Sequence, residues 1–257
     1  MNVLPRRFLP RRSPIAARLT PLSWPGQLCS LLLLCGLLLA ATPCARAQGG
    51  ADIPSNTVRL GLYNVFYHVS ANDLSGPYVP GGVNLDVQNL QTLYAAYVRH
   101  MWTHLDIELA FGWPPLTKTV GRGPAILGSV PYTGQEISTA RWFAPSLLFN
   151  YVFFDDTHAL RPYVGAGVNY TNFFDRQSTA AGNQASGGPT ALFLTPSFGP
   201  VGTVGLSYRW ALRWSAYLSY SLSDVHSDLK ADTAGVIRRT DIQFNPQALI
   251  VAVGYSF

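Results

Sequence analysis

The chain has 257 residues, of which 48% are hydrophobic and 12% are charged, about half the charged fraction usual in soluble domains. No run of about 18 or more apolar residues follows the N-terminal region, which excludes transmembrane helices there and favours short alternating strands. Six of the 18 basic residues precede Gln48 and all 13 acidic residues follow it, so the formal charge of +5 does not indicate nucleic-acid binding.

The N-terminal segment predicts a secretory signal peptide over residues 1–47. Residues 1–27 are rich in Arg and Pro, residues 28–41 are apolar but too short to span a bilayer, and Ala45-Arg46-Ala47 is a small-x-small cleavage signal. Cleavage between Ala47 and Gln48 removes all three cysteines, so the mature chain, 48–257, is expected to hold no disulfide and no thiolate site. The alternative is an uncleaved N-terminal membrane anchor.

Eight segments of period-two hydrophobicity follow, and each predicts a strand. Most alternate clearly, as Val58, Leu60 and Leu62 do with Arg59, Gly61 and Tyr63, whereas the second is weaker. In chain order they lie near residues 58–63, 91–99, 105–112, 143–153, 161–171, 203–210, 214–222 and 249–257. Pro145 disagrees with the fourth strand because proline cannot donate to a ladder, and it is expected to mark a bulge.

Alternation alone does not separate a soluble sandwich from a membrane barrel. Short links near 100–104, 154–160 and 210–213 alternate with long links near 70–89, 113–139, 175–200 and 223–243. Aromatic residues gather at both ends of the strands, as in a bilayer interface. The chain is therefore predicted to be an all-β, eight-stranded antiparallel transmembrane β-barrel in the bacterial outer membrane, with short periplasmic turns and long extracellular loops.

The last strand carries a further prediction. Its alternation ends on Val253, Tyr255 and Phe257, which resembles the C-terminal signal by which the outer-membrane assembly machinery recognises barrels. The lipid bilayer and that machinery are the expected partners.

Eight strands enclose a narrow interior that side chains just fill. The residues expected to line it are polar or small for the most part, and mixed charges among them are expected to pair across the lumen. They are Arg59, Asp106, Glu108, Ala110, Asn150, Arg161, Tyr163, Asn169 and Ser221. One interpretation is that they stiffen and plug the barrel, and the other is that they form a polar floor below a binding cavity.

The block Arg161-Pro-Tyr-Val-Gly-Ala-Gly-Val-Asn-Tyr-Thr-Asn-Phe-Phe174 closely resembles the outer-membrane protein W (OmpW) family. So do Leu105-Asp-Ile-Glu-Leu109, Val204-Gly-Leu-Ser-Tyr208 and the ending from Asn245-Pro-Gln through Gly254-Tyr-Ser-Phe257. The resemblance implies an eight-stranded barrel that takes a small hydrophobic ligand, or a detergent molecule, into its lumen and passes it sideways through the wall into the bilayer.

The resemblance also implies an apolar constriction of the lumen. The matching positions here, Ala110 and Ser221, are small. Either the alignment is shifted by a residue or two, or other side chains such as Tyr94, Leu148 or Tyr217 form the constriction.

Two other functions remain open beside a channel for small hydrophobic molecules. A structural or adhesive barrel would bind partners through its loops and transport nothing. A lipid A-modifying enzyme would need a serine-type site, for which His68, Ser70 and Asp73 are the candidates. No enzyme activity, metal or cofactor is expected, since His100, His104 and His158 read as solvated turn residues and no phosphate loop or dinucleotide motif is present.

Overall fold

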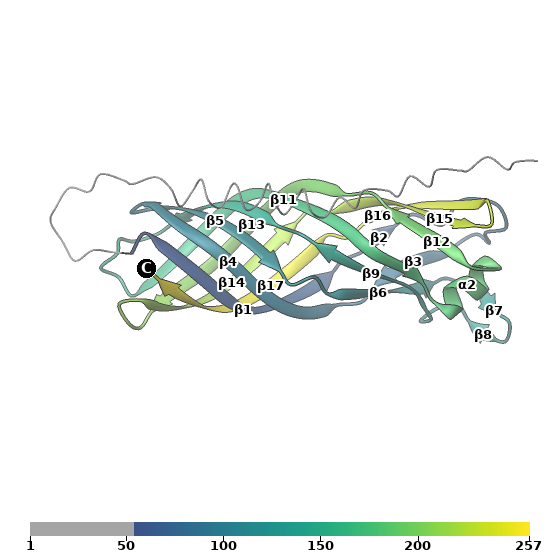
Figure 1. Cartoon of the computed structure of the whole chain (residues 1–257), viewed down its shortest axis with the longest axis horizontal. Coiled ribbons are helices and arrows are strands. Elements are labelled where there is room, and N and C mark those ends of the chain that lie inside the picture. The colour runs from purple at the N-terminus through teal and green to yellow at the C-terminus, as the bar shows by residue number, and fades with distance from the viewer. Residues whose placement is uncertain (1–53) are drawn as a thin grey trace, which may run out of the picture. The chain divides into compact units, whose positions relative to one another are not determined.

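The computed structural model describes residues 54–257, so the predicted signal peptide with its cleavage site at Ala47 and Gln48 lies outside the described residues. Within the described range, no helix is long and apolar enough to cross a membrane. Most described residues belong to strands that run along one common direction (Figure 1).

Eight antiparallel strands close into a barrel, which confirms the predicted fold class. Each strand pairs with the next along the chain, and the last pairs with the first, where Leu60 lies opposite Val253. Among the described residues, closure gives every barrel strand a partner on both sides, as a membrane-spanning sheet requires. The eight strands are β1 (Asn56–Tyr67), β4 (Leu90–Trp102), β5 (Leu105–Gly112), β10 (Ser146–Val152), β11 (Leu160–Ser178), β13 (Ser197–Arg209), β14 (Trp214–Ser223) and β17 (Pro246–Ser256).

The two ends of the barrel differ. Tight connections join β4 to β5, β10 to β11 and β13 to β14 at one end, which we call the short-turn end. The C-terminus lies at this end too (Figure 1), and the amide of Asn56 donates to the carbonyl of Phe257 at 3.2 Å. An even number of antiparallel strands produces this arrangement, because every strand that runs away from the short-turn end is followed by one that runs back to it.

At the opposite, long-loop end the predicted links carry strands of their own. The upper part of β11 pairs with β9 (Glu136–Phe143), followed by β6 (Leu116–Arg122) and β3 (Asn84–Val87). A separate four-stranded sheet contains β12 (Thr190–Leu194), β15 (His226–Thr233), β16 (Val236–Gln243) and β2 (Ser70–Ala71). The short elements α2 (Ala180–Ser186), β7 (Ile126–Leu127) and β8 (Val130–Pro131) lie at the tip (Figure 1).

The fourth predicted strand is wrong in one respect. It was expected to run unbroken over 143–153, but β9 ends at Phe143 and β10 starts at Ser146. Ala144 and Pro145 separate them, because Pro145 has no N–H to continue the ladder. Pro162, by contrast, lies near the start of β11, where it pairs with Leu206.

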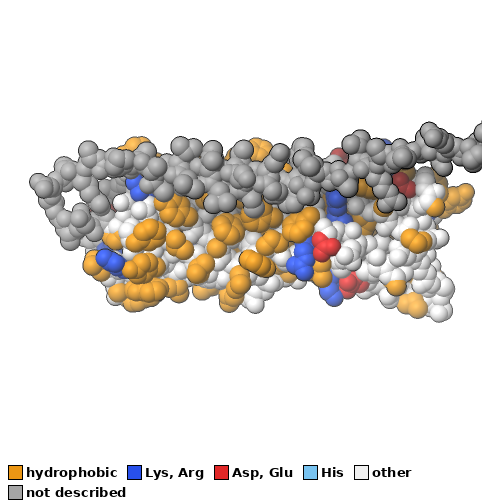
Figure 2. All heavy atoms as spheres, viewed as in Figure 1, with side chains coloured by type: hydrophobic (Ala, Val, Ile, Leu, Met, Phe, Trp, Pro, Cys, Tyr) orange, Lys and Arg blue, Asp and Glu red, His pale blue; other side chains and the backbone are white. Residues whose placement is uncertain are grey.

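The outer wall is apolar. Alternate residues of each barrel strand point outward, and many of these are large and exposed, such as Leu60 at 62% and Val251 at 51%. Figure 2 shows hydrophobic side chains over the visible barrel wall, with charged side chains gathered where the long-loop extension begins. An apolar outer band of this kind suits contact with lipid.

Candidate functional site

A buried polar network crosses the barrel interior. Arg59 donates from Nη1 to Oε2 of Glu108 at 2.8 Å, and Asn150 donates to the same oxygen at 2.7 Å. Tyr94 donates its hydroxyl to Oε1 of Glu108 at 2.5 Å. These side chains come from β1, β4, β5 and β10, so the network ties four strands together across the interior.

Two tyrosines complete the network on the far side of Arg59. The guanidinium carbon lies 3.8 Å from the ring centre of Tyr217 and 5.6 Å from that of Tyr163. Such stacking favours a buried cation, since the ring face carries negative charge. Arg59 and Glu108 are each only 3% exposed. We call these six residues the partition: Arg59, Tyr94, Glu108, Asn150, Tyr163 and Tyr217.

Glycines leave room for the partition. A Cβ atom at Gly205 would lie 2.3 Å from the ring of Tyr163, and one at Gly254 would lie 2.5 Å from the ring of Tyr217. Real Cβ atoms do not approach other atoms so closely, so the tyrosine rings occupy the space that a side chain would need. The small residues predicted to face inward thus accommodate large side chains from neighbouring strands.

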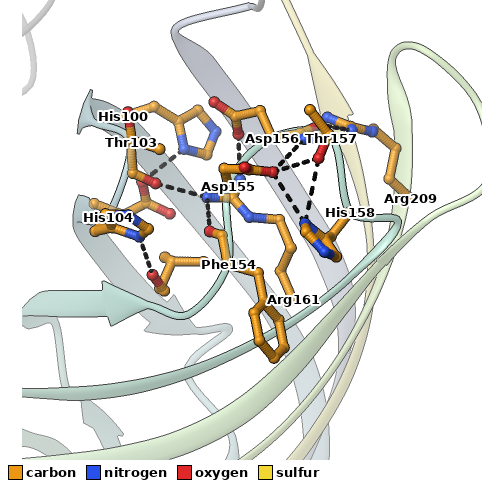
Figure 3. Close-up of polar contacts among 12 residues, drawn as sticks. His100, Thr103, His104, Phe154, Asp155, Asp156, Thr157, His158, Arg161 and Arg209 are labelled. Carbon is orange, nitrogen blue, oxygen red and sulfur yellow. Dashed lines mark hydrogen bonds and ion pairs between the residues drawn. The ribbon is translucent and has the colours of Figure 1, made fainter.

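Below the partition lies a polar space of about 700 Å³, the turn-side cavity, which opens at the short-turn end. His100 and Asp106 face each other there at 2.7 Å, and His100 also contacts Thr57 of β1 at 2.8 Å. Arg161 donates to Asp156 at 2.5 Å and to the carbonyl of Thr103 at 2.7 Å. Figure 3 shows His100, Thr103, Asp156 and Arg161 close together at this end of the barrel.

Asp155 organises one of these turns. Its Oδ1 accepts from the Thr157 hydroxyl at 2.5 Å and lies 2.9 Å from Nδ1 of His158. The hydrogen bond from Thr157 and then that from His158 lower the pKa of Asp155 to about 2, because both favour the ionised carboxylate. The turn therefore keeps its charge down to strongly acidic pH.

Above the partition lies a small space, the middle cavity. Ala110 and Ser221, the two small positions, both line it and are buried, and Ser221 donates to the hydroxyl of Thr203 at 2.9 Å. Leu148 lines it as well. Asn169 lies one level higher, where it donates to Ser146 at 2.9 Å and accepts from Thr171.

Apolar side chains line two further spaces at the long-loop end. The inner apolar cavity, about 840 Å³, is lined by residues that include Trp142, Phe173 and Phe244. Phe173 and Phe244 pack with ring centres 5.4 Å apart. The mouth cavity, about 900 Å³, lies toward the tip and shares Leu85, Leu192 and Leu229 with the inner one. Together they form an apolar funnel above the middle cavity.

The barrel wall is incomplete beside the middle cavity. The ladder between β5 and β10 ends where Ala110 lies opposite Ser146, and the ladder between β6 and β9 starts only where Leu116 lies opposite Arg141. The next two pairs in this register, Phe111 with Pro145 and Gly112 with Ala144, are not formed. Pro114, Pro115 and Pro145 lie in this stretch, which we call the wall gap (residues 111–115 and 142–145).

Two aromatic rings cover the wall gap from outside. Phe111 and Phe143 pack with ring centres 6.0 Å apart. From inside, the middle cavity reaches Phe111, Gly112 and Ala144, and Ala144 lines the inner apolar cavity too. Ala144 therefore stands where the funnel, the middle cavity and the wall gap meet.

The last strand ends on the outer face. Val253, Tyr255 and Phe257 are all exposed on β17, and Tyr255 packs on Trp214 with ring centres 5.1 Å apart. Their position suits contact with lipid. Their role as an assembly signal remains a prediction.

The candidate serine site is not assembled. Among the described residues, no hydrogen bond joins any two of His68, Ser70 and Asp73. Asp73 instead accepts from the amide of Gly82 at 3.2 Å. The part of the chain that the structure describes also contains no group of three or more side chains arranged to hold a metal ion.

Several residues of the apolar funnel are not evident from the sequence. Trp142, Phe173, Phe244 and the arginines Arg176 and Arg238 line its two cavities. The signal was present in β16, where Arg238, Thr240 and Ile242 alternate inward. This alternation does not stand out in the sequence, because residues 223–243 form one of the long links between the predicted strands.

Comparison with known proteins gives consistent results. The OmpW family model matches residues 124–257. Outer membrane protein W of Vibrio cholerae is 27% identical over 229 residues, which cover 87% of this chain and 98% of that protein. The dibenzothiophene metabolism operon protein PahQ of Pseudomonas aeruginosa is 34% identical over 138 residues, 51% of this chain and 59% of that protein.

A solved structure agrees with the fold. The outer membrane protein OprG of Pseudomonas aeruginosa superposes with a TM-score of 0.71 at 20% identity, covering 81% of this chain and 98% of that one. At this identity the similarity supports the barrel architecture alone.

Proposed function

The chain belongs to the OmpW family of bacterial outer-membrane proteins, and we propose that its barrel admits small hydrophobic molecules from outside and releases them sideways into the bilayer. In this orientation the short-turn end faces the periplasm and the long-loop end is extracellular. The observation that carries the proposal is an apolar funnel that leads to the middle cavity, below which the polar partition blocks the barrel.

The partition makes a straight path to the periplasm unfavourable for apolar cargo. A hydrophobic molecule would have to separate the buried charges of Arg59 and Glu108, and an unpaired buried charge costs several kcal/mol. The wall gap requires much less, since no ladder hydrogen bonds have to be broken between Gly112 and Ala144. Beyond it lies lipid, where apolar cargo is stable.

The name of a relative agrees with this class of cargo. PahQ is described as a protein of a dibenzothiophene metabolism operon, and dibenzothiophene is a small apolar aromatic molecule. The cargo of the present chain is proposed only at the level of that class.

Entry of a small apolar probe into liposomes tests the proposal. Liposomes that contain the purified barrel should take up the probe faster than empty ones. Ala144→Trp should slow uptake about tenfold, because the indole fills the junction of the funnel, the middle cavity and the wall gap. Ala211→Trp, on an exposed turn at the other end, serves as the matched control and should leave uptake unchanged.

Equal uptake with and without the barrel would contradict transport and favour the structural or adhesive alternative. Equal uptake by the Ala144→Trp and wild-type proteins would contradict the lateral route.

A further inference from the structure

The mouth cavity contains a buried cation. Arg238 lies on β16 and is 9% exposed, and it is the only charged side chain among the described residues that line this cavity. Its neighbours in the cavity wall are mostly apolar, among them Val83, Leu127 and Leu229. A cavity built for purely apolar cargo has no need of a guanidinium.

The described residues satisfy Arg238 poorly. Its Nε donates to the carbonyl of Pro77 at 3.3 Å and its Nη1 to the hydroxyl of Thr233 at 3.4 Å. Both distances exceed the usual range for protein hydrogen bonds. A guanidinium offers five N–H groups, so three have no partner among the described residues, and Nη2, which makes no hydrogen bond there, is not fully buried.

Nearby carboxylates are engaged elsewhere. Asp232 accepts from the amide of Gly235 at 3.0 Å, and Asp73 accepts from Gly82 and Asn84. Asp228 and Asp241 lie opposite each other on the exposed face of β15 and β16. No carboxylate of the described residues lies within ion-pair distance of Arg238.

The inner apolar cavity repeats the arrangement. Arg176 is the only charged side chain of the described residues that line it, and its one hydrogen bond, 3.2 Å long, goes to the carbonyl of Leu194. Two apolar cavities in series thus each hold one arginine and no carboxylate.

We infer that the funnel binds small amphipathic anions, with the apolar body against the cavity wall and a carboxylate on Arg238. Burying a cation without a counter-charge is costly, and a bound carboxylate would offset that cost through two parallel hydrogen bonds. Arg176 would then provide a second binding position for the carboxylate, in the inner apolar cavity. This inference rests on the proposed function, since it names the class of molecule that enters.

Calorimetry on the full barrel in lipid nanodiscs tests the inference with two matched probes, cinnamate and cinnamyl alcohol, which share one apolar body. With the heat from empty nanodiscs subtracted, cinnamate should bind about tenfold more tightly than the alcohol, because a hydrogen bond to a charged group is worth more than one to a neutral group. Arg238→Gln should abolish that difference. Arg239→Gln, the exposed neighbour on the same strand, should preserve it.

Equal binding of the two probes by the wild-type barrel would overturn the inference, as would a preference that survives Arg238→Gln. If Arg238→Gln fails to fold, Arg238→Lys serves in its place. Lysine keeps the positive charge but cannot form the bidentate pair of hydrogen bonds, so this variant should bind cinnamate more weakly than the wild type. Faster liposome uptake of a neutral apolar probe tests the proposed function separately. That result without a preference for cinnamate leaves the transport proposal intact and removes this one.

Discussion

At the scale of single residues, the pairing of Arg59 with Glu108 decides whether the interior is open or closed. The two charges are 2.8 Å apart and almost fully buried, and Tyr94 and Asn150 use the remaining acceptor positions of the carboxylate. A buried ion pair is worth keeping only when its other hydrogen bonds are also made. Here they are made for Glu108 by the two neighbouring strands, β4 and β10.

Removal of one partner of this pair should be costly. Glu108→Gln leaves Arg59 buried without a counter-charge, which we expect to lower the free energy of unfolding by about 3–5 kcal/mol. Urea unfolding in lipid vesicles, followed by tryptophan fluorescence, measures the change. Glu136→Gln is the matched control, because its ion pair with Lys118 is largely exposed, and it should cost about 0–1 kcal/mol.

The double variant Arg59→Met/Glu108→Gln should recover much of the lost stability, since neither charge is then left alone. If Glu108→Gln costs no more than Glu136→Gln, the partition does not hold the barrel together in the way described.

At the scale of elements, the wall gap is the feature that sets this barrel apart from an uninterrupted ladder. Ladder pairs such as Glu108 with Leu148 lie a few residues below it. Those amides are bonded across the strands, whereas the pair Gly112 with Ala144, beyond the last ladder pair, is not formed and borders a cavity.

Hydrogen exchange should detect this difference. The amides of Gly112 and Ala144 are expected to exchange at least tenfold faster than those of Glu108 and Leu148, because unbonded amides that border a cavity lack protection. NMR of the barrel in lipid bilayers measures the individual rates. Equal protection of the two pairs would mean that the wall is closed by contacts other than the ladder.

The barrel strands could be predicted from the sequence, whereas most long-loop strands could not. Alternation marks the barrel strands because apolar side chains face lipid on one side. In β15 the contrast is weak, since exposed Asp228 alternates with inward Ser227 and Ala231, which are small. The alternation along its strand places Glu108 on the inner face, but alternation does not tell which side chains from other strands contact it.

At the scale of the whole molecule, the alternation of short and long connections predicts the orientation in the membrane. Cysteine at Ala185, exposed in α2, should react with an impermeant thiol reagent on intact cells. Cysteine at Thr157, in a short turn, should react only after the outer membrane is permeabilised. Labelling is read on gels, and the reverse pattern would overturn the orientation.

The wild-type chain is the control for this labelling. All three of its cysteines precede Gln48, so it should remain unlabelled once the signal peptide is removed. Labelling of the wild type would favour the uncleaved N-terminal anchor instead.

The partition also matters for the cell that carries the barrel. The outer membrane protects a bacterium by slowing the entry of hydrophilic solutes, including many toxic ones. A barrel whose interior is blocked by Arg59, Glu108 and their neighbours offers such solutes no water-filled passage. Many copies can therefore be present at once without opening the envelope to hydrophilic solutes.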